Sequence, residues 1–520
     1  MRCCRALALL LLLTSTTQAD VLGRVLRLAD DGASGSGPAP SAPPTQDETL
    51  TAWAGPAQMI TLPELLKYAV QHAPALESAR IDIAIAEAQI SETFSRDDWH
   101  IDAQVFGQSS SGYISGLRID RSTVIGASVD VSRLLPTGGT LTLHGSTQYS
   151  RTTSPFPPND KLTNWSDEVN ATYVQPLMKG RGRWLYEASE LRAKLSQDAA
   201  VLAKRLAAIN AVQTVISAYW DLVLAERTIA ITQASLDLAK ERLRFTQAGV
   251  DGGKVPRSEL PAVEQIIATR EEDILNAELA VLDRSIALRR AAGLPIGAGE
   301  LGLQVDSDVV EGDSAGALAD LTERAYAAAP QLLQLTKQGA VANLDIEVTE
   351  NGLLPQLDAA LTLGPTTQSE AFGTATRDLF RAGSFALSGQ LRYQHSLGQE
   401  DIKGRARELR ENKRKLVVNA FDVRAQIAQG MAQSVAQMEL ATRRVKLSER
   451  AIELANQNIK LEQDRFNLGK STNFDVLNRL EEMRQAQLRR TQAIIDWQKA
   501  RAVAMALTGD ILPGYGISVD

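Results

Sequence analysis

The sequence predicts a protein that combines very long α-helices with a membrane-type antiparallel β-sheet. Two segments show helical periodicity over more than 60 residues each, several times the length of an ordinary globular helix. Shorter segments between them alternate strictly between apolar and polar residues, as the strands of a membrane barrel do. The same order of segments occurs twice along the 520 residues. We therefore expect a mixed all-α and transmembrane β fold built from two internal repeats.

The chain begins with a stretch that is typical of a secretory signal peptide. Arg2 and Arg5 precede a short apolar core, and Ala19 ends a small-residue cleavage site. We expect residues 1–19 to be removed and residues 20–58, which are rich in Gly, Ser, Pro and Ala, to form a flexible linker. Both cysteines lie in the leader, so no disulfide is expected in the mature chain.

The composition excludes several classes of function. The 55 basic and 62 acidic residues become 53 and 62 when Arg2 and Arg5 leave with the leader, a net charge of −9, and the basic residues are scattered. Nucleic acid is therefore not an expected partner. After the leader, no run of 18 apolar residues predicts a transmembrane helix. The four histidines are dispersed and no catalytic, metal or dinucleotide motif occurs, so we expect no enzyme activity and no cofactor.

The two repeats are expected at residues 59–300 and 318–509, with a linker at 301–317 and a tail at 510–520. Their openings match at an offset of 256 residues: Leu62, Leu65, Ala69, Pro74 and Leu76 align with Leu318, Leu321, Ala325, Pro330 and Leu332. A later match, ending at Phe245 and Phe466, has an offset of 221. The first repeat therefore holds 256 − 221, or 35, extra residues between its matched ends.

Six helices are expected, at 61–98, 185–248, 256–292, 318–352, 401–468 and 474–508. At 1.5 Å per residue, the two longest would reach about 95 to 100 Å. Between Val417 and Phe466, positions spaced alternately three and four residues apart form a coiled-coil seam. A second stripe on this helix consists of Leu440, Leu447, Leu454, Leu461 and Leu468. Two seams predict a helix with neighbours on both sides.

The alternating segments fall within residues 99–177 and 356–394. Ile125, Ala127 and Val129, for example, share one face, and the residues between them are small or polar. Six such segments occur, at 101–105, 125–131, 141–149, 169–173, 357–363 and 385–393. A membrane barrel with a wet interior and a soluble sandwich would both use such strands. The long helices and the leader favour the barrel.

A Gly-Lys-Ser-Thr stretch at residues 469–472 resembles the end of a phosphate-binding loop. That loop needs a glycine where this chain has Asp464, and it follows a strand rather than a long polar helix. We therefore reject a nucleotide site. The stretch instead predicts a turn between two helices, in which Gly469 takes a left-handed conformation and one of residues 471–473 caps the second helix.

Taken together, these features resemble the TolC family of outer membrane efflux proteins. The resemblance covers about Thr61 to Leu507 and rests on the duplicated plan, "YVQPLMKGRGR" at Tyr173, "LLPQLD" at Leu353, and an R-F-x-x-G-x-x-x-x-x-D-V-L turn that begins at Arg465. It implies a homotrimer whose strands close jointly into one outer-membrane β-barrel and whose helices form a long periplasmic α-barrel. Family members are exit ducts for inner-membrane pumps, joined through a periplasmic adaptor. They usually contribute four strands per protomer, so the six segments here leave the strand number open.

The resemblance also assigns roles to two helical turns at the inner tip of the tube. In the first turn, Gly249 would end a helix. The expected adaptor contacts are Gly249, Val250, Leu468, Gly469, Lys470, Ser471 and Thr472.

A pore constriction is expected just beyond the second turn. Asp475 falls where the family places an acidic residue facing the pore, and Asn478 replaces a second acid. In a trimer, Asp475 would form a ring of three charges that attracts cations. The alternative is an exposed aspartate that stabilises a helix N-terminus.

The closed-state contacts of the family are only partly present. Glu259 matches the acidic partner of that lock, whereas Phe466 replaces a tyrosine and Ser471 replaces an arginine. Lys470 is our candidate to substitute for the missing arginine. Two other functions stay open: a non-conducting envelope coiled coil, which needs no alternating strands, and an ordinary porin, which needs no long helices.

Overall fold

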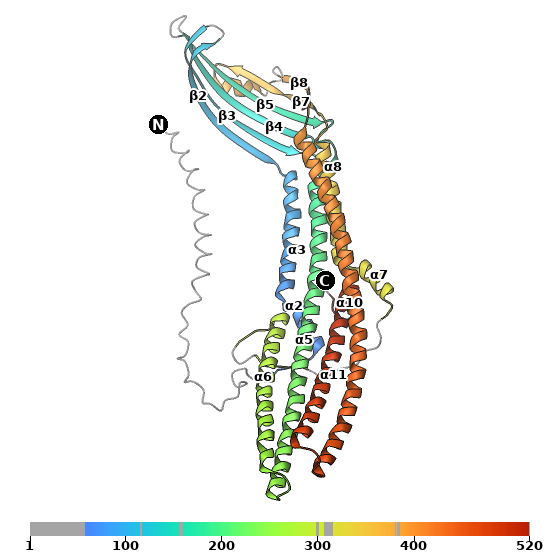
Figure 1. Cartoon of the computed structure of the whole chain (residues 1–520). Coiled ribbons are helices and arrows are strands. Elements are labelled where there is room, and N and C mark those ends of the chain that lie inside the picture. The colour runs from blue at the N-terminus through green and yellow to red at the C-terminus, as the bar shows by residue number, and fades with distance from the viewer. Residues whose placement is uncertain are drawn as a thin grey trace, which may run out of the picture. The chain divides into compact units, whose positions relative to one another are not determined.

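The computed structural model describes residues 58–114, 117–154, 160–297, 301–305, 316–379, 381 and 385–518. The expected leader and, apart from Gln58, the expected linker 20–58 lie outside these residues. In the described part, a layer of long helices continues into a six-stranded antiparallel sheet (Figure 1).

Two helices run the length of the helical part, α5 (Ala188–Asp251) and α10 (Glu400–Asn467). Their 64 and 68 residues extend about 96 and 102 Å at 1.5 Å per residue. Near the sheet they pack with α3 (Pro74–Thr93) and α8 (Pro330–Asn351), in the order α3, α5, α8, α10. At the far end they pack with α6 (Leu260–Ala292) and α11 (Asn473–Thr508), in the order α6, α5, α11, α10. Each level is thus one layer of four helices (Figure 1).

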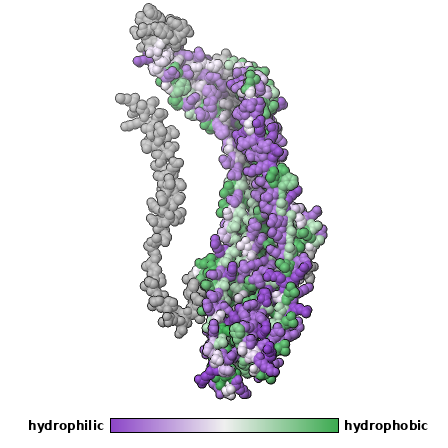
Figure 2. Space-filling view, viewed as in Figure 1, coloured by the Kyte–Doolittle hydropathy of each residue, from purple (hydrophilic) through white to green (hydrophobic). Residues whose placement is uncertain are grey.

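The two apolar stripes predicted on α10 differ in burial. The coiled-coil seam is buried in this chain, at Ile427, Met431, Ser434, Met438, Ala441, Val445, Ser448, Ala455, Ile459 and Glu462. The leucines of the second stripe, by contrast, are 47–71% exposed. Figure 2 shows that apolar side chains reach the surface of the helices among mostly hydrophilic ones. One seam therefore packs inside the chain, and the other has no partner among the described residues.

Prolines divide the two expected helices at 61–98 and 318–352. The first becomes α2 (Leu62–His72) and α3, and the second becomes α7 (Leu318–Ala328) and α8. Pro74 and Pro330 lack an N–H and force the preceding alanines into extended conformations, with ψ of 125° and 111°. The expectation of two unbroken helices was therefore wrong, and the break recurs at the positions aligned between the repeats.

The six alternating segments form one antiparallel sheet in the order β2-β3-β4-β5-β7-β8. Its strands are β2 (His100–Ile114), β3 (Leu117–Leu134), β4 (Thr140–Ser154), β5 (Asp160–Pro176), β7 (Gln356–Ser369) and β8 (Phe385–Gln394). The protomer thus supplies six strands, of 10 to 18 residues each. The first repeat supplies β2 to β5 and the second supplies β7 and β8, and β2 and β8 are the two edges.

One face of this sheet is apolar and exposed. The register places apolar side chains that are each at least 40% exposed on one side: Ile101, Val105, Ile125, Val129, Leu143, Val169, Leu361, Leu363, Phe385, Leu387, Leu391 and Tyr393. The other side is polar, and there His144 Nδ1 lies 2.7 Å from Asp130 Oδ1 on the neighbouring strand. A sheet with one apolar exposed face and one polar face is suited to a boundary between lipid and water.

The expected inter-repeat linker and the expected tail both contribute to the core. Residues Gln58–Ile60 form β1, which pairs in parallel with β6 (Leu303–Val305). Leu303 and Val305 are buried in the main core cluster, as are Ile511 and Leu512 at the end of the chain. The expected linker at 301–317 thus contains the strand β6, and the expected tail at 510–520 contains a short helix, and apolar side chains of both pack in the core beside α5. The remaining short elements are η1 (Phe94–Asp97), α4 (Arg183–Tyr186), η2 (Arg257–Glu259), α9 (Phe372–Leu379) and α12 (Ile511–Gly514).

Among the described residues, α5 contains one stretch that is long and apolar enough to cross a membrane, and 28% of that stretch is buried. The buried side chains of α5 include Val212, Val215 and Ile216, which belong to the main core cluster. Core packing therefore accounts for part of the apolar character of this helix.

Candidate functional site

Two helical turns lie at the end of the helical layer that is farthest from the sheet (Figure 1). The second turn joins α10 to α11. Gly469 has a φ of +70°, which is the predicted left-handed conformation. Thr472 is the N-cap of α11: its hydroxyl accepts the N–H of Asp475 at 3.3 Å, and the Asp475 carboxylate accepts the N–H of Thr472 at 3.0 Å. This reciprocal capping box confirms the predicted turn.

The first turn differs from the prediction. Helix α5 does not end at Gly249 but continues to Asp251, and Gly253 takes the left-handed conformation instead, with a φ of +70°. The carbonyl of Gly249 accepts the N–H groups of Lys254 and Val255 as the chain turns back. A Cβ on Gly249 would lie 2.7 Å from Cγ2 of Val255, so this glycine permits close packing rather than a helix end.

Asp475 is partly exposed and is held by the second turn. Besides the N–H of Thr472, its carboxylate accepts the hydroxyls of Thr472 at 2.7 Å and Ser471 at 3.2 Å. These hydrogen bonds, first those from Thr472, lower the pKa of Asp475 below its usual value. The aspartate therefore completes the capping box of α11, and it stays ionised at neutral pH. Asn478, one turn further along α11, is exposed.

Within the described part of this chain, the four residues expected to form the closed-state contacts make no hydrogen bond or ion pair with one another. Oε2 of Glu259 accepts the backbone N–H of Asn473 at 3.1 Å, which joins the two hairpins. The hydroxyl of Ser471 donates to Oε1 of Glu462 at 2.5 Å, inside its own hairpin. Lys470 is exposed and forms no ion pair within the part of the chain that the structure describes. Glu259 is thus the expected residue that links the two turns.

The structure adds Arg242 and Asn473, which sequence reasoning missed. Nε of Arg242 on α5 donates to Oδ1 of the fully buried Asn473 at 2.7 Å. The guanidinium also lies over the ring of Phe466, 4.0 Å from its centroid, and 5.3 Å from that of Phe245. The side chain of Asn473 therefore accepts a hydrogen bond from Arg242, and the backbone N–H of Asn473 donates one to Glu259. The repeat offered a signal, because it aligned Phe245 with Phe466, whose ring centroids are 6.4 Å apart.

The Arg242 contact is electrostatically unusual. Burial lowers the pKa of the guanidinium, and the charge of Glu259 partly offsets this effect. Nη2 of Arg242 and Nδ2 of Asn473 are both buried without a hydrogen-bond partner among the described residues. The hub at Asn473 therefore has unused donors, and a buried unsatisfied donor costs stability.

A second polar link lies above the tip. Arg270 of α6 donates to Glu481 of α11, and the Arg270 side chain is only 12% exposed. Burial raises the pKa of Glu481, but hydrogen bonds from Arg484 and Gln485 and the charges of Arg484 and Arg270 outweigh burial and lower it. Ionised partners thus join the two hairpins here too.

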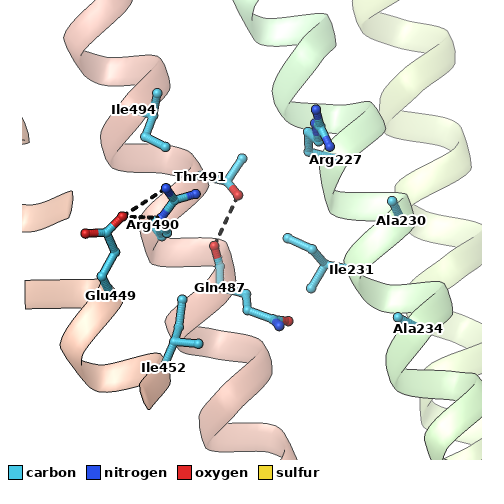
Figure 3. Close-up of a pocket in the computed structure, with 10 residues that line it drawn as sticks. All are labelled: Arg227, Ala230, Ile231, Ala234, Glu449, Ile452, Gln487, Arg490, Thr491 and Ile494. Carbon is cyan, nitrogen blue, oxygen red and sulfur yellow. Dashed lines mark hydrogen bonds and ion pairs between the residues drawn. The ribbon is translucent and has the colours of Figure 1, made fainter. Parts of the chain in front are cut away.

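A cavity of about 790 Å³ separates the hairpins further from the tip (Figure 3). It lies between α5 on one side and α10 with α11 on the other, and Arg490 and Glu449 form an ion pair at 2.9 Å along its wall. Its lining residues lie about 20 to 35 Å from the helix ends at 1.5 Å per residue. Packing between the hairpins is interrupted here. The contacts near the tip join them on one side of the cavity, and the main core and the Lys499–Asp221 ion pair join them on the other.

Several solved structures share this fold. The outer membrane protein VceC of Vibrio cholerae matches with a TM-score of 0.60 and 13% identity, over 86% of this chain and 96% of that chain. The MtrE outer membrane channel of Neisseria gonorrhoeae, in its open state, matches with a TM-score of 0.61 and 16% identity, over 86% and 89%. A membrane protein of Pseudomonas aeruginosa matches with a TM-score of 0.63 and 14% identity, over 94% of this chain and 100% of that chain. No curated protein matches the sequence.

A layer of long helices that continues into a membrane-type sheet is therefore the fold of outer membrane channels. Residues 65–294 also match the sequence profile of the family described as outer membrane efflux protein. The resemblance read from the sequence motifs is confirmed: residues 65–294 match the outer membrane efflux protein family, and the chain has the fold of outer membrane channels.

Proposed function

We propose that three copies of this chain form an exit duct that crosses the periplasm and the outer membrane. An inner-membrane pump, joined through a periplasmic adaptor, would supply energy and cargo in an efflux or type I secretion system. The observation that carries this proposal is the six-stranded sheet, which has one apolar face, two open edges and a direct continuation into the helices.

Closure between copies follows from the strand directions. The six strands alternate in direction, so β8 of one copy would lie antiparallel to β2 of the next. In lipid, every backbone N–H and C=O needs a partner, and only a closed barrel provides one for an edge strand. The exposed leucine stripe of α10 supports the same assembly, because a helix of a neighbouring copy would cover it.

The tip would act as the gate of the duct. Asp475 and Asn478 would line its constriction, and residues 249, 250 and 468–472 would contact the adaptor. The links from Arg242 and Glu259 to Asn473 would keep the two hairpins together in the closed state. Lys470 would act between copies, since it forms no ion pair within the described part of this one.

Single-channel conductance of the purified protein in a planar bilayer tests the proposal. We expect small, cation-selective steps from a trimer that dissociates only on heating in detergent. Large, ungated steps would favour an ordinary porin. A trimer that inserts but does not conduct would favour an envelope scaffold, although such a scaffold has no need of the six-stranded sheet.

A further inference from the structure

The apolar face of the sheet ends in a defined order of residue types. Along β4, away from the helices, this face carries Leu141, Leu143, Gly145, Thr147, Tyr149 and then Arg151. The step from Leu141 to Tyr149 spans eight residues, about 27 Å along the strand and about 20 Å when the strand is tilted as in a barrel. The stretch of this face from Leu141 to Tyr149 therefore has about the height of the band that contacts lipid in a membrane barrel.

Aromatic rings mark both ends of this band. At the outer end, Tyr149, Trp165 and Phe372 form a chain of rings with successive centroid separations of 4.9 Å. At the helix end, Arg133 lies over the ring of Trp99, 5.6 Å from its centroid. Aromatic side chains favour the level of lipid headgroups at the two surfaces of a membrane. The outer rings therefore place the headgroup region beside Tyr149.

Two arginines lie immediately beyond the outer rings. Arg151 pairs with Thr123, and Arg121 pairs with Thr153, so the two arginines are diagonal neighbours on β3 and β4. They continue the alternation of Ile125 and Tyr149, and both are exposed. Neither forms an ion pair with any residue whose side chain the structure describes. Two guanidinium groups are therefore available together at the headgroup level.

The nearest described carboxylate on this face is already engaged. Asp167 is 4% exposed, and it accepts the hydroxyls of Thr147 at 2.7 Å and Thr376 at 2.9 Å beneath α9. Helix α9 is held on the same face by the hydroxyl of Thr367, which donates to the carbonyl of Ala375. Asp167 therefore does not neutralise the arginine pair, and an external anion can.

We propose that Arg121 and Arg151 bind the phosphate groups of anionic lipid headgroups in the outer leaflet. A guanidinium binds phosphate oxygens through two parallel hydrogen bonds, and the adjacent aromatic and apolar residues contact the acyl part of the same lipid. The inference rests on the proposed function, which places this sheet in the outer membrane.

The test is a lipid titration of the full-length protein in detergent. The probe is lipid A that carries two phosphates, compared with the same lipid after removal of both. We expect the wild-type protein to prefer the phosphorylated form, and the Arg121→Gln/Arg151→Gln variant to bind it at least about tenfold more weakly. Arg121→Lys/Arg151→Lys retains charge without the forked donors and should give an intermediate Kd.

Arg450→Gln/Arg489→Gln is the matched control, because it removes two exposed arginines from α10 and α11. This control should keep wild-type affinity, and heat-modifiable trimers report correct folding of each variant. Equal affinity of wild type and the Arg121/Arg151 double variant would overturn the inference, as would equal affinity for the dephosphorylated lipid. Displacement of the lipid by millimolar inorganic phosphate would indicate a free-phosphate site instead. Conductance measured in parallel separates failure of the duct from failure of this site.

Discussion

The two helical turns at the tip are held in different ways. The turn between α10 and α11 is fixed by its own side chains, since Ser471, Thr472 and Asp475 bond to one another. The turn between α5 and α6 has backbone hydrogen bonds, and its hairpin directs Arg242 and Glu259 onto Asn473 of the other one. One turn is thus a self-contained unit, and the other supplies the contacts between units. Substitutions of Arg242 and Glu259 in the α5–α6 hairpin should therefore affect gating, and substitutions in the α10–α11 turn should affect stability.

Arg242→Ala should have the largest effect. It removes a charged hydrogen bond to a buried acceptor and the stacking on Phe466, at a cost of about 2 to 3 kcal/mol to the link between hairpins. We expect larger and more frequent conductance steps in a planar bilayer. Arg244→Ala is the matched control, because Arg244 is exposed two residues away on the same helix. Equal conductance of the Arg242→Ala and Arg244→Ala variants would show that Arg242 does not contribute to gating.

Glu259→Ala should have the next largest effect. It leaves the buried N–H of Asn473 without an acceptor, at a cost of about 1 to 3 kcal/mol, and should also increase conductance. Glu259→Gln keeps an oxygen at this position and should behave nearly as wild type. If Gln were as disruptive as Ala, the charge of Glu259 rather than its hydrogen bond would hold the hairpins.

Thr472→Ala tests the self-contained turn. Loss of the N-cap should lower the stability of α11 by about 1 kcal/mol, visible as a lower Tm, with little change in conductance. An effect on conductance as large as that of Arg242→Ala would contradict the division between the two turns.

Asp475→Asn separates the role of Asp475 in the capping box from the pore charge that we propose for it. The side-chain oxygen of asparagine can still accept the N–H of Thr472, but the negative charge near the N-terminus of α11 is lost, so we expect a small loss of stability. Cation selectivity should fall if Asp475 lines the pore. Hydrogen bonds lower the pKa of this aspartate below its usual value of 3.8. The charge of Asp475 and the stability that comes with it are therefore retained at pH values above 3.8, and they are lost only as the pH falls through the lowered pKa. Selectivity measured from pH 7 to 4 should therefore be constant in the wild type. A loss of selectivity near pH 5 would show that like charges in the trimer raise the pKa instead.

Lys470→Ala should have the smallest effect. Lys470 is exposed, so the variant should unfold at the wild-type temperature within error. If Lys470 reaches a neighbouring copy in the closed state, the closed-state conductance will rise modestly. An unchanged closed-state conductance would show that Lys470 takes no part in the closed-state contacts.

Much of the fold follows from local patterns. The seam of α10 and the alternation in β3 are periodic over many residues, so their periods predict the element and the buried face. The breaks at Pro74 and Pro330 could also be predicted, because they follow from the chemistry of proline. The pairing of Gln58–Ile60 with Leu303–Val305 could not, since three-residue strands carry no period and these two lie 303 − 58, or 245, residues apart in the sequence.

At the tip, too, local features were predictable and contacts between distant segments were not. Gly469 and Thr472 were predictable, because turn and cap preferences act within a few residues. The contact between Arg242 and Asn473 joins positions 231 residues apart, and nothing in either neighbourhood specifies the other. Gly249 was misread because a glycine near a helix end also serves close packing, here against Val255.

The number of strands in the sheet has an electrical consequence for the proposed trimer. Two strands more than the usual four in each of three copies add six strands, about 38 Å of circumference and about 12 Å of diameter. Pore segments in series add their resistances, and a wider segment contributes less. The voltage across the open protein would therefore fall mainly at the helical tip, so that a recorded current reports on the hairpins and hardly at all on the strands.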